Sequence, residues 1–369
     1  MKILVMATDY PNKNTRKLMY IHTRNLYYKK QGNEVVVLNF KTDENYKIDD
    51  IEVISLQHYK QNINKFKNYL LISHAPNIRN HYIFLKKYEK NFKNIVFFFH
   101  GHEVLKINKV YSKPYTYMKK NFIKIQFQNI YDDLKLYLWR NYLTKLNYKS
   151  YYIFVSKWMY KEFLKWTKID AKFLKNKYSI TYNGIGEFFE EKNYDYDSRK
   201  KYDFITIRTN LDGSKYAIDI VNDLAIRNPD FKFLIIGCGN YFSHNKKSDN
   251  VDWINRTMNH SEIIKELNIA RCALMPTRTD AQGLMMCEMA TFGIPVITSD
   301  IDVCHEVFEE FENVEYINND NLDSVNLEKL YNTINKKTIK NTKYFYKNTT
   351  SQEIKIFKKI LGENKWHLY

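Results

Sequence analysis

Short runs rich in β-branched and aromatic residues alternate with longer helical patterns along the chain, and the alternation begins a second time near residue 203. Such alternation is typical of βα units, in which helices join parallel strands. The first half predicts strands at Lys2–Thr8, Glu34–Phe40, Leu70–Ser73, Ile95–His100, Tyr151–Ser156 and Tyr178–Tyr182. The second half predicts strands at Asp203–Thr209, Phe231–Gly237, Val251–Ile254, Ala273–Pro276 and Pro295–Ser299, with helices such as Ser214–Arg227 and Ser261–Ala270 between them. The pattern predicts an α/β protein with two Rossmann-like sheets.

The length of 369 residues also favours two domains, because a single hydrophobic core usually stops growing at roughly 250–300 residues. Residues 187–201 are polar, charged and without period, so we expect the interdomain linker there. The domains are then expected at 1–186 and 202–345. The tail 346–369 places four apolar residues on one helical face, which predicts that it docks on the first domain: Ile354, Phe357, Ile360 and Leu361.

The chain carries 58 Lys and Arg against 41 Asp and Glu, a net charge of +17. This excess indicates an anionic partner, which could be nucleotide phosphates, an acidic membrane surface or nucleic acid. Biased use of Lys, Asn, Ile and Tyr would raise the charge without any such partner. The sequence shows no export signal and no apolar run of ~18 residues, so we expect a cytoplasmic protein. Its 4 cysteines lie far apart without zinc-ligand spacing, so we expect reduced thiols and no metal site.

Residues 106–149 interrupt the first domain with ten Lys and Arg and only two acidic residues. Apolar residues recur there at helical spacing, at Ile123, Phe127, Ile130, Leu134 and Leu138, flanked by Tyr117, Tyr131, Tyr137, Trp139 and Tyr142. A basic, aromatic-edged helix suits an anionic membrane surface. A helix packed on its own domain with a solvated basic face fits the same pattern, because any surface helix has an apolar stripe. Both interpretations stay open at this point.

Candidate ligand-binding residues follow the expected strands, where ligands bind in open α/β sheets. Strand Ala273–Pro276 leads into a polar loop with Asp280, and Gly283 opens a helix that carries Glu288. One carboxylate therefore lies on a loop and the other inside a helix, so the two can bracket an extended ligand. Ionised carboxylates accept two donors at once, which suits sugar and ribose hydroxyls.

The residues between these two acids suit phosphate groups. Gly283 allows close backbone approach, and the amides of Leu284 and Met285 near a helix N-terminus can bind phosphate oxygens. A sugar nucleotide presents a sugar, a diphosphate and a ribose in that order.

The run DAQGLMMCEMATFGIPVITSD, residues 280–300, resembles the donor-site signature of retaining GT-B glycosyltransferases of the Glu-x7-Glu type, the group 1 (family 4-like) enzymes of bacterial polysaccharide biosynthesis. That signature has two acids, a small-residue turn and Gly-x-Pro-Val. The resemblance implies that the position of Asp280 contacts the transferred sugar and that Glu288 holds the ribose hydroxyls. Here the first acid is Asp instead of Glu, so the sugar's identity stays open.

Further positions match the same family in order along the chain. Arg208 and Lys215 match the basic pair that neutralises the donor diphosphate, and fixed cations stabilise the charge that builds as this group leaves. The resemblance places the base near Asn255 and Arg256, with Asn255 where the family has Gly, and it matches the glycine turn at Gly237. It places His100 beside the donor sugar.

Two histidine neighbours have alternative explanations. His102 with His100 would suggest a metal site, but no third ligand is near, so none is expected. His74 follows another expected strand and either faces the ligand or caps its strand.

The resemblance implies a GT-B fold, in which two Rossmann-like domains face each other across a cleft. It implies retaining, metal-independent transfer of a hexose-type sugar from a nucleoside diphosphate-sugar, which we expect to be a UDP-sugar. The acceptor is expected to be a glycan or lipid-linked glycan of surface polysaccharide biosynthesis, bound by the first domain. The enzyme would then be peripheral at the inner face of the cell membrane.

Two other classes of protein fit parts of the same pattern. A noncatalytic GT-B-like subunit that binds a sugar nucleotide or a partner enzyme would tolerate Asp280 in place of Glu. A nucleic-acid-binding protein would explain the charge of +17 and the 31 tyrosines. The sequence shows no compact basic motif of that kind, so no nucleic-acid partner is expected.

Overall fold

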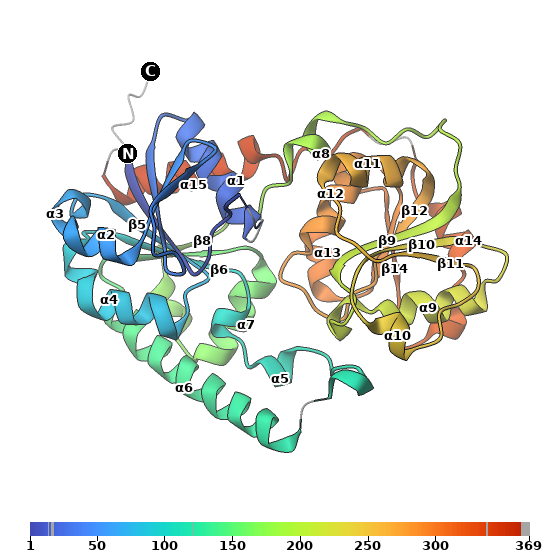
Figure 1. The fold of residues 1–369 in the computed structure, drawn as a ribbon, viewed down its shortest axis with the longest axis horizontal. Coiled ribbons are helices and arrows are strands. Elements are labelled where there is room, and N and C mark those ends of the chain that lie inside the picture. Colours follow the sequence, from blue (N-terminus) through green and yellow to red (C-terminus); the bar gives the residue numbers. More distant parts are fainter. Residues whose placement is uncertain (14, 16–17, 120, 337–338, 363–369) are drawn as a thin grey trace. The chain divides into compact units, whose positions relative to one another are not determined.

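The computed structural model describes residues 1–13, 15, 18–119, 121–336 and 339–362. The chain divides into two compact units (Figure 1). Unit 1 comprises Met1–Lys106, Ile130–Gly184 and the stretch that begins at Tyr346. Unit 2 comprises Ile107–Asn129 and Ile185–Phe345. The chain therefore crosses between the units four times, at 106/107, 129/130, 184/185 and 345/346.

Unit 1 is built on an 8-stranded sheet of order β3-β4-β2-β1-β5-β6-β7-β8. Its strands are β1 (Lys2–Ala7), β2 (Glu34–Asn39), β3 (Tyr46–Ile48), β4 (Ile51–Ile54), β5 (Leu70–His74), β6 (Ile95–Phe99), β7 (Ser150–Phe154) and β8 (Tyr178–Ile180). Neighbouring strands run parallel except β3 and β4, which pair antiparallel. The helices wholly in this unit are α1 (Met19–Lys30), α2 (Leu56–Gln61), α3 (Ile63–Phe66), α4 (Ile83–Tyr88), α7 (Lys157–Thr167) and α15 (Tyr346–Ile360).

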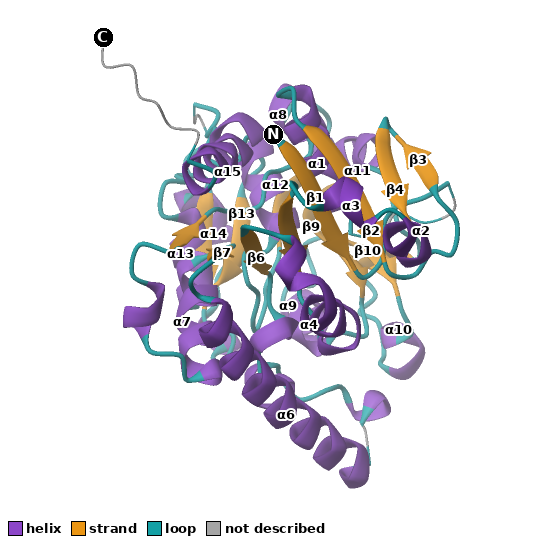
Figure 2. Cartoon of the chain, turned by 90° about the vertical axis from the view of Figure 1, so that its left-hand side faces the viewer, coloured by secondary structure: helices purple, strands orange, loops and turns teal. Residues whose placement is uncertain are grey.

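Helices cover both faces of this sheet (Figure 2). Ile3 and Val5 of β1 share a buried cluster with Ile21 of α1 and Phe357 of α15. On the opposite face of the sheet, Phe99 of β6 contacts Phe163 of α7, with ring centroids 4.8 Å apart. Because both faces are buried, the central strands are continuous apolar runs, which is how parallel strands of this kind are recognised in a sequence.

Unit 2 is built on a 6-stranded parallel sheet of order β11-β10-β9-β12-β13-β14. Its strands are β9 (Tyr202–Asn210), β10 (Phe233–Cys238), β11 (Val251–Ile254), β12 (Ala270–Leu274), β13 (Val296–Ser299) and β14 (Val314–Ile317). Its helices are α5 (Ile107–Val110), α8 (Glu187–Glu191), α9 (Ile218–Arg227), α10 (Tyr241–His244), α11 (His260–Asn268), α12 (Leu284–Phe292), α13 (Asp302–Phe308) and α14 (Leu327–Thr333). The first strand, β9, is central, and the strand order reverses between β9 and β12, which is the doubly wound arrangement.

Each strand expected from the sequence is present within three residues at either end. The structure adds β3, β4 and β14. Strands β3 and β4 form a tight hairpin whose turn residues, Asp49 and Asp50, both have positive φ (44° and 66°). Strands β3 and β4 have only three and four residues, which are too few to show a periodicity in the sequence. Helix Ser214–Arg227 is in fact two elements, a 3-10 helix η6 (Ser214–Tyr216) and α9, separated by Ala217 with a φ of 53°.

The segment 187–201, expected to be a linker, is folded within unit 2. It contains α8, and its Phe189 and Tyr194 are buried. The N–H of Tyr194 donates to the carbonyl of Phe292 (2.8 Å), and its hydroxyl donates to the carbonyl of Ala270 (2.6 Å). Two anchoring aromatics among charged residues are enough to hold a segment that has no apolar period.

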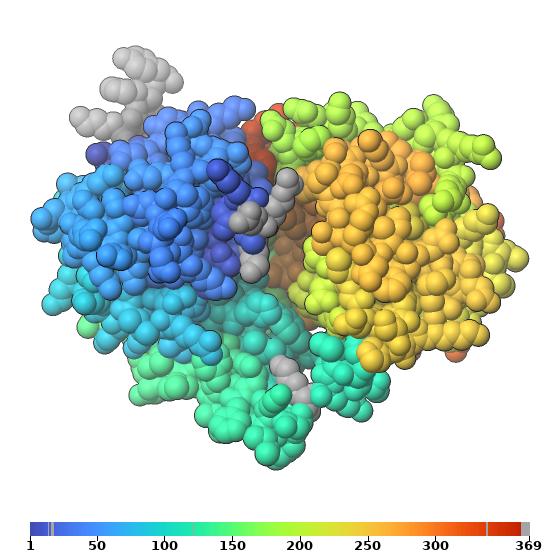
Figure 3. All heavy atoms as spheres, viewed as in Figure 1, coloured from blue at the N-terminus to red at the C-terminus, as the bar shows by residue number. Residues whose placement is uncertain are grey.

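The basic segment 106–149 divides between the units. Its main element is α6 (Phe122–Leu146), a single helix whose first part clusters with unit 2 and whose remainder clusters with unit 1. Its last turns bury Trp139, Leu143 and Leu146. Earlier in the helix the expected apolar stripe faces solvent, since Ile123, Phe127, Ile130 and Leu134 are between 52% and 68% exposed. The surface of this helix is visible in green at the lower edge of Figure 3. The packed interpretation therefore does not account for this stripe.

Helix α15 packs on α1 in unit 1. Its Glu353 is fully buried and accepts hydrogen bonds from Arg24 (3.0 Å), Thr181 (3.1 Å) and Tyr28. Arg24 also donates to Asn183 (2.8 Å). A buried ion pair with several hydrogen bonds fixes the position of α15 on unit 1.

Within the described residues, no helix is both long enough and apolar enough to cross a membrane.

Candidate functional site

The candidate residues of unit 2 meet at one edge of its sheet. Arg208 lies near the carboxyl end of β9, and Gly237 is the second-last residue of β10. Asn255 and Arg256 follow β11 directly. The loop with Asp280 follows β12. Since β9 and β12 are neighbours at the point where the strand order reverses, their loops enclose the position at which such sheets bind ligands.

Arg208 is a buried cation held by the loop after β12. Its side chain is 6% exposed, and Nη2 donates to the carbonyls of Met275 (3.2 Å) and Pro276 (2.7 Å). Among the described residues its Nε has no hydrogen-bond partner. Burial lowers the pKa of Arg208, and the nearby carboxylate of Asp280 opposes this shift. A buried guanidinium with an unused N–H is suited to an anionic ligand, because leaving it unpaired is energetically unfavourable.

Lys215 lies on the short turn η6 between β9 and α9. Its carbonyl accepts hydrogen bonds from the N–H of Arg278 (2.8 Å) and the hydroxyl of Thr277 (3.0 Å), so the turn is tied to the loop after β12. Its ammonium lies 4.6 Å from the ring centre of Tyr216, and the guanidinium of Arg208 lies 5.2 Å from that same ring. The two cations thus contact one aromatic ring. No ion pair of Lys215 occurs among the described residues, which leaves its charge available to a ligand.

Asp280 and the N-terminus of α12 lie on the same loop. Gly283 precedes the helix with a φ of 72°, and a side chain at this position would place its Cβ 2.1 Å from Cε of Met286. The Oδ1 atom of Asp280 accepts a hydrogen bond from the N–H of Ala281 (2.8 Å). The first amides of α12, those of Leu284 and Met285, have no carbonyl of the preceding turn to bond. These amides and the positive end of the helix dipole favour a phosphate.

Glu288 lies inside α12 and is almost fully buried, at 3% exposure. Its Oε1 accepts a hydrogen bond from the N–H of Gly186 (3.1 Å) and lies 3.8 Å from Nε2 of His260. Burial raises the pKa of Glu288 to about 7, and the Gly186 N–H works in the opposite direction. A Cβ at Gly186 would lie 2.5 Å from the His260 ring, so any side chain at this position would require the ring to move. The carboxylate therefore changes its charge near neutral pH.

The loops after β10 and β11 are joined by a hydrogen bond from Trp253 Nε1 to the carbonyl of Gly237 (3.0 Å). A Cβ at Gly237 would lie 1.9 Å from the carbonyl oxygen of Arg208, so only glycine fits. Arg256 pairs with Glu262 (2.8 Å) in the first turn of α11 and is half-exposed. Asn255 is exposed. These two residues lie at the same sheet edge, and neither is fixed in the way that Arg208 is.

His100 lies in unit 1, at the end of β6, whereas the other candidates lie in unit 2. Nε2 of His100 is 3.1 Å from Nδ1 of His74, the last residue of the neighbouring strand β5. The backbone N–H of His100 donates to the carboxylate of Glu103 (2.8 Å). Burial lowers the pKa of both histidines well below the usual range. Nε2 of His74 has no partner among the described residues. A buried lone pair without a partner costs less than a buried N–H, so Nδ1 of His74 donates to His100.

The sequence did not single out several residues that organise this site. Arg278 forms a bidentate ion pair with Asp219 (2.9 and 2.7 Å), and its Nη1 also donates to the carbonyl of Ser214 (2.8 Å). Tyr115, from a segment expected in the first domain, donates to the same Asp219 (3.0 Å). Arg278 lies two residues before Asp280 on the loop after β12, and this position is the sequence signal that could have marked it.

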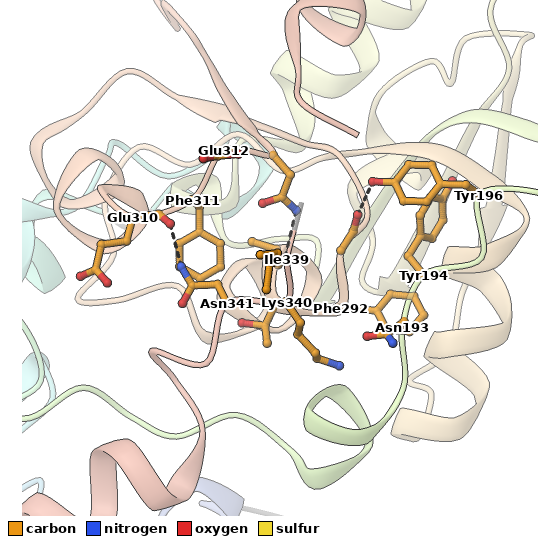
Figure 4. Close-up of a pocket in the computed structure, with 14 residues that line it drawn as sticks. Asn193, Tyr194, Tyr196, Phe292, Glu310, Phe311, Glu312, Ile339, Lys340 and Asn341 are labelled. Carbon is orange, nitrogen blue, oxygen red and sulfur yellow. Dashed lines mark hydrogen bonds between the residues drawn. The ribbon is translucent and has the colours of Figure 1, made fainter. Parts of the chain in front are cut away.

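A cavity of about 680 Å³ lies at the other end of α12, around Tyr196, Phe292, Glu310 and Asn341 (Figure 4). Its polar groups are largely engaged: the hydroxyl of Tyr196 donates to the carbonyl of Gly293 (2.8 Å), and Asn341 donates to that of Glu310 (2.7 Å). This cavity is separate from the loops that carry Arg208 and Asp280. Within the part of the chain that is described, no three His, Cys, Asp or Glu side chains are grouped to hold a metal ion.

Comparison with known proteins addresses the identity of this chain. Residues 190–352 match the family model described as Glycosyl transferases group 1. No curated protein matches the sequence.

Solved structures resemble the chain over nearly its whole length. The sucrose-phosphate synthase from Thermosynechococcus elongatus has 10% identity and a TM-score of 0.66, covering 98% of this chain and 100% of that chain. TarM has 11% identity and a TM-score of 0.65, covering 97% and 98%. WaaG, a glycosyltransferase involved in lipopolysaccharide biosynthesis, has 14% identity and a TM-score of 0.57, covering 89% and 90%.

These likenesses give the fold, and the family match gives the class of the second half. Two parallel-sheet α/β domains with these structural neighbours form the GT-B fold. The chain thus has the GT-B fold, and its residues 190–352 match the group 1 glycosyltransferase model.

Proposed function

We propose that the chain transfers a hexose-type sugar, with retention of configuration, from a nucleoside diphosphate-sugar bound by unit 2 to a glycan acceptor bound by unit 1. One observation carries the donor half of this proposal. The buried Arg208, the unpaired Lys215, the first amides of α12 and the buried Glu288 share one sheet edge. Two cations and two amides suit a diphosphate, and a carboxylate beyond them suits a ribose.

The diphosphate would lie against Arg208 and Lys215, with the N-terminus of α12 contributing its amides. As the bond between the sugar and the diphosphate breaks, negative charge builds on the leaving oxygens, and fixed donors stabilise it without reorganising. These side chains supply the positive charge of the site, so we propose that no metal is required. Glu288 would accept the ribose hydroxyls, and Asp280 would contact the sugar.

Retention is proposed through displacement on one face of the sugar. The acceptor oxygen would bond to the anomeric carbon as the bond to the phosphate oxygen breaks on the same face. The acceptor proton would move to a phosphate oxygen of the leaving group. Asp280 is the acid nearest to the sugar end, and it would stabilise developing positive charge there instead of forming a covalent intermediate.

The donor is proposed to be a UDP-sugar and the acceptor a lipid-linked glycan of surface polysaccharide biosynthesis. A structural neighbour bound with UDP-2-fluoro glucose supports the base, and the lipopolysaccharide role of WaaG supports the pathway class. The exposed stripe of α6, with Lys119 and Lys124 near its start, supports attachment to an anionic membrane surface.

The donor proposal is tested by thermal shift with a panel of nucleotide sugars, since a ligand that binds only the folded state raises its stability. The best ligand is then used to compare donor hydrolysis by wild type, Glu288→Ala and Lys215→Ala. We expect wild type to hydrolyse the donor slowly and both variants to lose this activity. A wild type that binds the donor but never turns it over would instead support a noncatalytic sugar-nucleotide-binding subunit.

The membrane proposal is tested separately, by cosedimentation with vesicles containing anionic lipid. Phe127→Ser with Ile130→Ser should reduce binding strongly, and Lys119→Gln with Lys124→Gln should remove its salt dependence. Vesicle binding that is unchanged in both double variants would contradict the proposal.

A further inference from the structure

We propose that residues Ile107–Lys119, here called the strap, hold the turn that carries Lys215, and that Tyr115 and Tyr117 are positioning residues for the donor diphosphate. This inference rests on the proposed donor site and concerns how one of its two cations is fixed. The strap lies in the sequence between β6 and β7, two strands of unit 1, yet it clusters with unit 2.

Three side chains of the strap bond to residues on either side of Lys215. The hydroxyl of Ser112 lies 2.9 Å from that of Ser214. The hydroxyl of Tyr115 donates to Asp219 (3.0 Å). The hydroxyl of Tyr117 donates to Asp212 (2.7 Å). Positions 212, 214 and 219 bracket Lys215, so the strap spans the whole turn from the end of β9 to the start of α9.

The strap is also docked by its rings. The ring of Tyr115 lies 4.9 Å from that of Tyr241, and the ring of Tyr117 stacks on His244 at 4.3 Å. Both tyrosines pack against the hydrophobic core of unit 2. Burial raises the pKa of both phenols, so the hydroxyls keep their protons and act as donors. Tyr111 adds a further contact, with its ring centre 5.5 Å from the ammonium of Lys215.

The turn forms two backbone hydrogen bonds of its own, from Tyr216 to Gly213 (2.8 Å) and from Ala217 to Ser214 (3.1 Å), but it also contains a residue in an unfavourable conformation. Ala217 has a φ of 53°, a left-handed conformation that is unfavourable for a residue other than glycine. Ala217 also occupies the N-cap of α9, where it offers no side-chain hydrogen bond. The hydroxyl oxygen of Tyr115 takes over that task, because it accepts a hydrogen bond from the N–H of Ile218 (3.1 Å).

The strap and the loop after β12 hold the turn together. Asp219 accepts hydrogen bonds from both Tyr115 and Arg278 on the same oxygen, Oδ1, and Arg278 also bonds the backbone of the turn. Without the strap, the hydrogen bonds of Arg278 to the turn would remain, but the cap of α9 and the hydrogen bond to Asp212 would be lost. The ammonium of Lys215 would then occupy a wider range of positions, and the diphosphate would bind less tightly.

The experiment uses the full chain and hydroxyl deletions that keep the rings. Binding of UDP, ADP and GDP is measured by calorimetry, and the tightest binder and its matching nucleoside are then compared in Tyr115→Phe and Tyr117→Phe. The matched control is Tyr202→Phe. The hydroxyl of Tyr202 also donates to an aspartate, Asp252, at 2.7 Å, but Tyr202 lies at the start of β9, whereas the turn with Lys215 follows its end.

We expect the diphosphate to bind about tenfold more weakly in Tyr115→Phe and Tyr117→Phe, as loss of a hydrogen bond to a charged partner would produce. Nucleoside affinity should be unchanged, and Tyr202→Phe should bind both as wild type does. Ser112→Ala, which keeps both tyrosines, should give a smaller loss in the same direction.

Three results have distinct meanings. Strap variants that bind the diphosphate as tightly as Tyr202→Phe would overturn this inference. Strap variants that lose nucleoside affinity by the same factor would also overturn it, because they would indicate general loosening of unit 2. If wild type binds none of the three diphosphates, or if Arg208→Ala binds them as wild type does, the proposed donor site itself fails.

Discussion

The carboxyl edges of the two sheets carry different chemistry. In unit 2 that edge holds the cations Arg208 and Lys215 and the carboxylates Asp280 and Glu288. In unit 1 the ends of β5 and β6 carry His74 and His100, whose pKa values burial lowers well below the usual range. At neutral pH the first edge therefore carries charged groups, whereas the ends of β5 and β6 present uncharged imidazoles. A charged edge suits phosphates, and an uncharged one suits the hydroxyls of a sugar.

The largest expected effect tests the charged edge. Arg208→Ala should lower the rate of transfer by roughly 100- to 1000-fold, because a preorganised donor to the leaving group is lost. Steady-state kinetics with the identified donor measure this. Arg208→Lys keeps a charge and should recover part of the rate, and Arg227→Ala, at the exposed end of α9, should behave as wild type. Similar losses of rate in Arg208→Ala and Arg227→Ala would mean that Arg208 does not act as a specific donor to the leaving group.

The next effect tests the uncharged edge. His100→Ala should lower transfer about 30-fold, or ~2 kcal/mol, since the proposed hydrogen bond to the sugar would be lost and His74 would be left unpaired. The affinity for the nucleoside diphosphate, which lacks the sugar, should not change. His102→Ala, at an exposed neighbouring position, is the control. A parallel loss of diphosphate affinity would show that the two edges are not separate in function.

A pH titration sharpens the contrast, because Glu288 changes charge near pH 7. Between pH 8 and pH 6 its ionised fraction falls about tenfold, so the affinity for the nucleoside diphosphate should fall by up to the same factor. Calorimetry at several pH values measures this. Glu288→Gln should bind weakly at every pH, with no such slope.

Acid unfolding through Glu288 cannot explain that loss of affinity. Its folded-state pKa is raised above its ordinary value of 4.5, so the folded chain binds this proton more tightly than the unfolded chain does. Its contribution to stability is therefore greatest below pH 4.5 and decreases as the pH rises to about 7. A wild type whose diphosphate affinity is flat from pH 6 to pH 8 would show that Glu288 does not hold the ribose.

The smallest expected effect concerns the sugar end of the charged edge. Asp280→Glu lengthens the first acid by one methylene, and it should change the ratio of kcat/KM between two donor sugars about fivefold, or ~1 kcal/mol. Competition between the two sugars measures this ratio. Asp300→Glu, at an exposed carboxylate paired with His305, should leave the ratio unchanged. An unchanged ratio in Asp280→Glu would place the sugar away from Asp280.

Much of the fold could be predicted because buried parallel strands such as β1 and β9 are continuous apolar runs between helical patterns. The candidate residues could be expected close together because Arg208 lies near the end of β9 and Asp280 lies on the loop after β12, the neighbouring strand. The segment 107–129 could not be assigned to unit 2 in this way, because its place depends on the hydroxyls of Tyr115 and Tyr117 and not on any apolar period. Residues 187–201 show no apolar period for a similar reason, because two buried aromatics, Phe189 and Tyr194, anchor them among polar neighbours.

The four crossings between the units have a practical consequence for dividing this protein. A fragment beginning at residue 185 would include every strand of unit 2 and still lack the strap, since Ile107–Asn129 precede it in the chain. Asp212 and Asp219 would lose their tyrosine partners, and α9 would lose its cap. Recombining halves of related glycosyltransferases at that junction would combine a strap from one parent with a turn from the other. Exchanges that move residues 107–129 together with 185–345 keep the strap and the turn from the same parent.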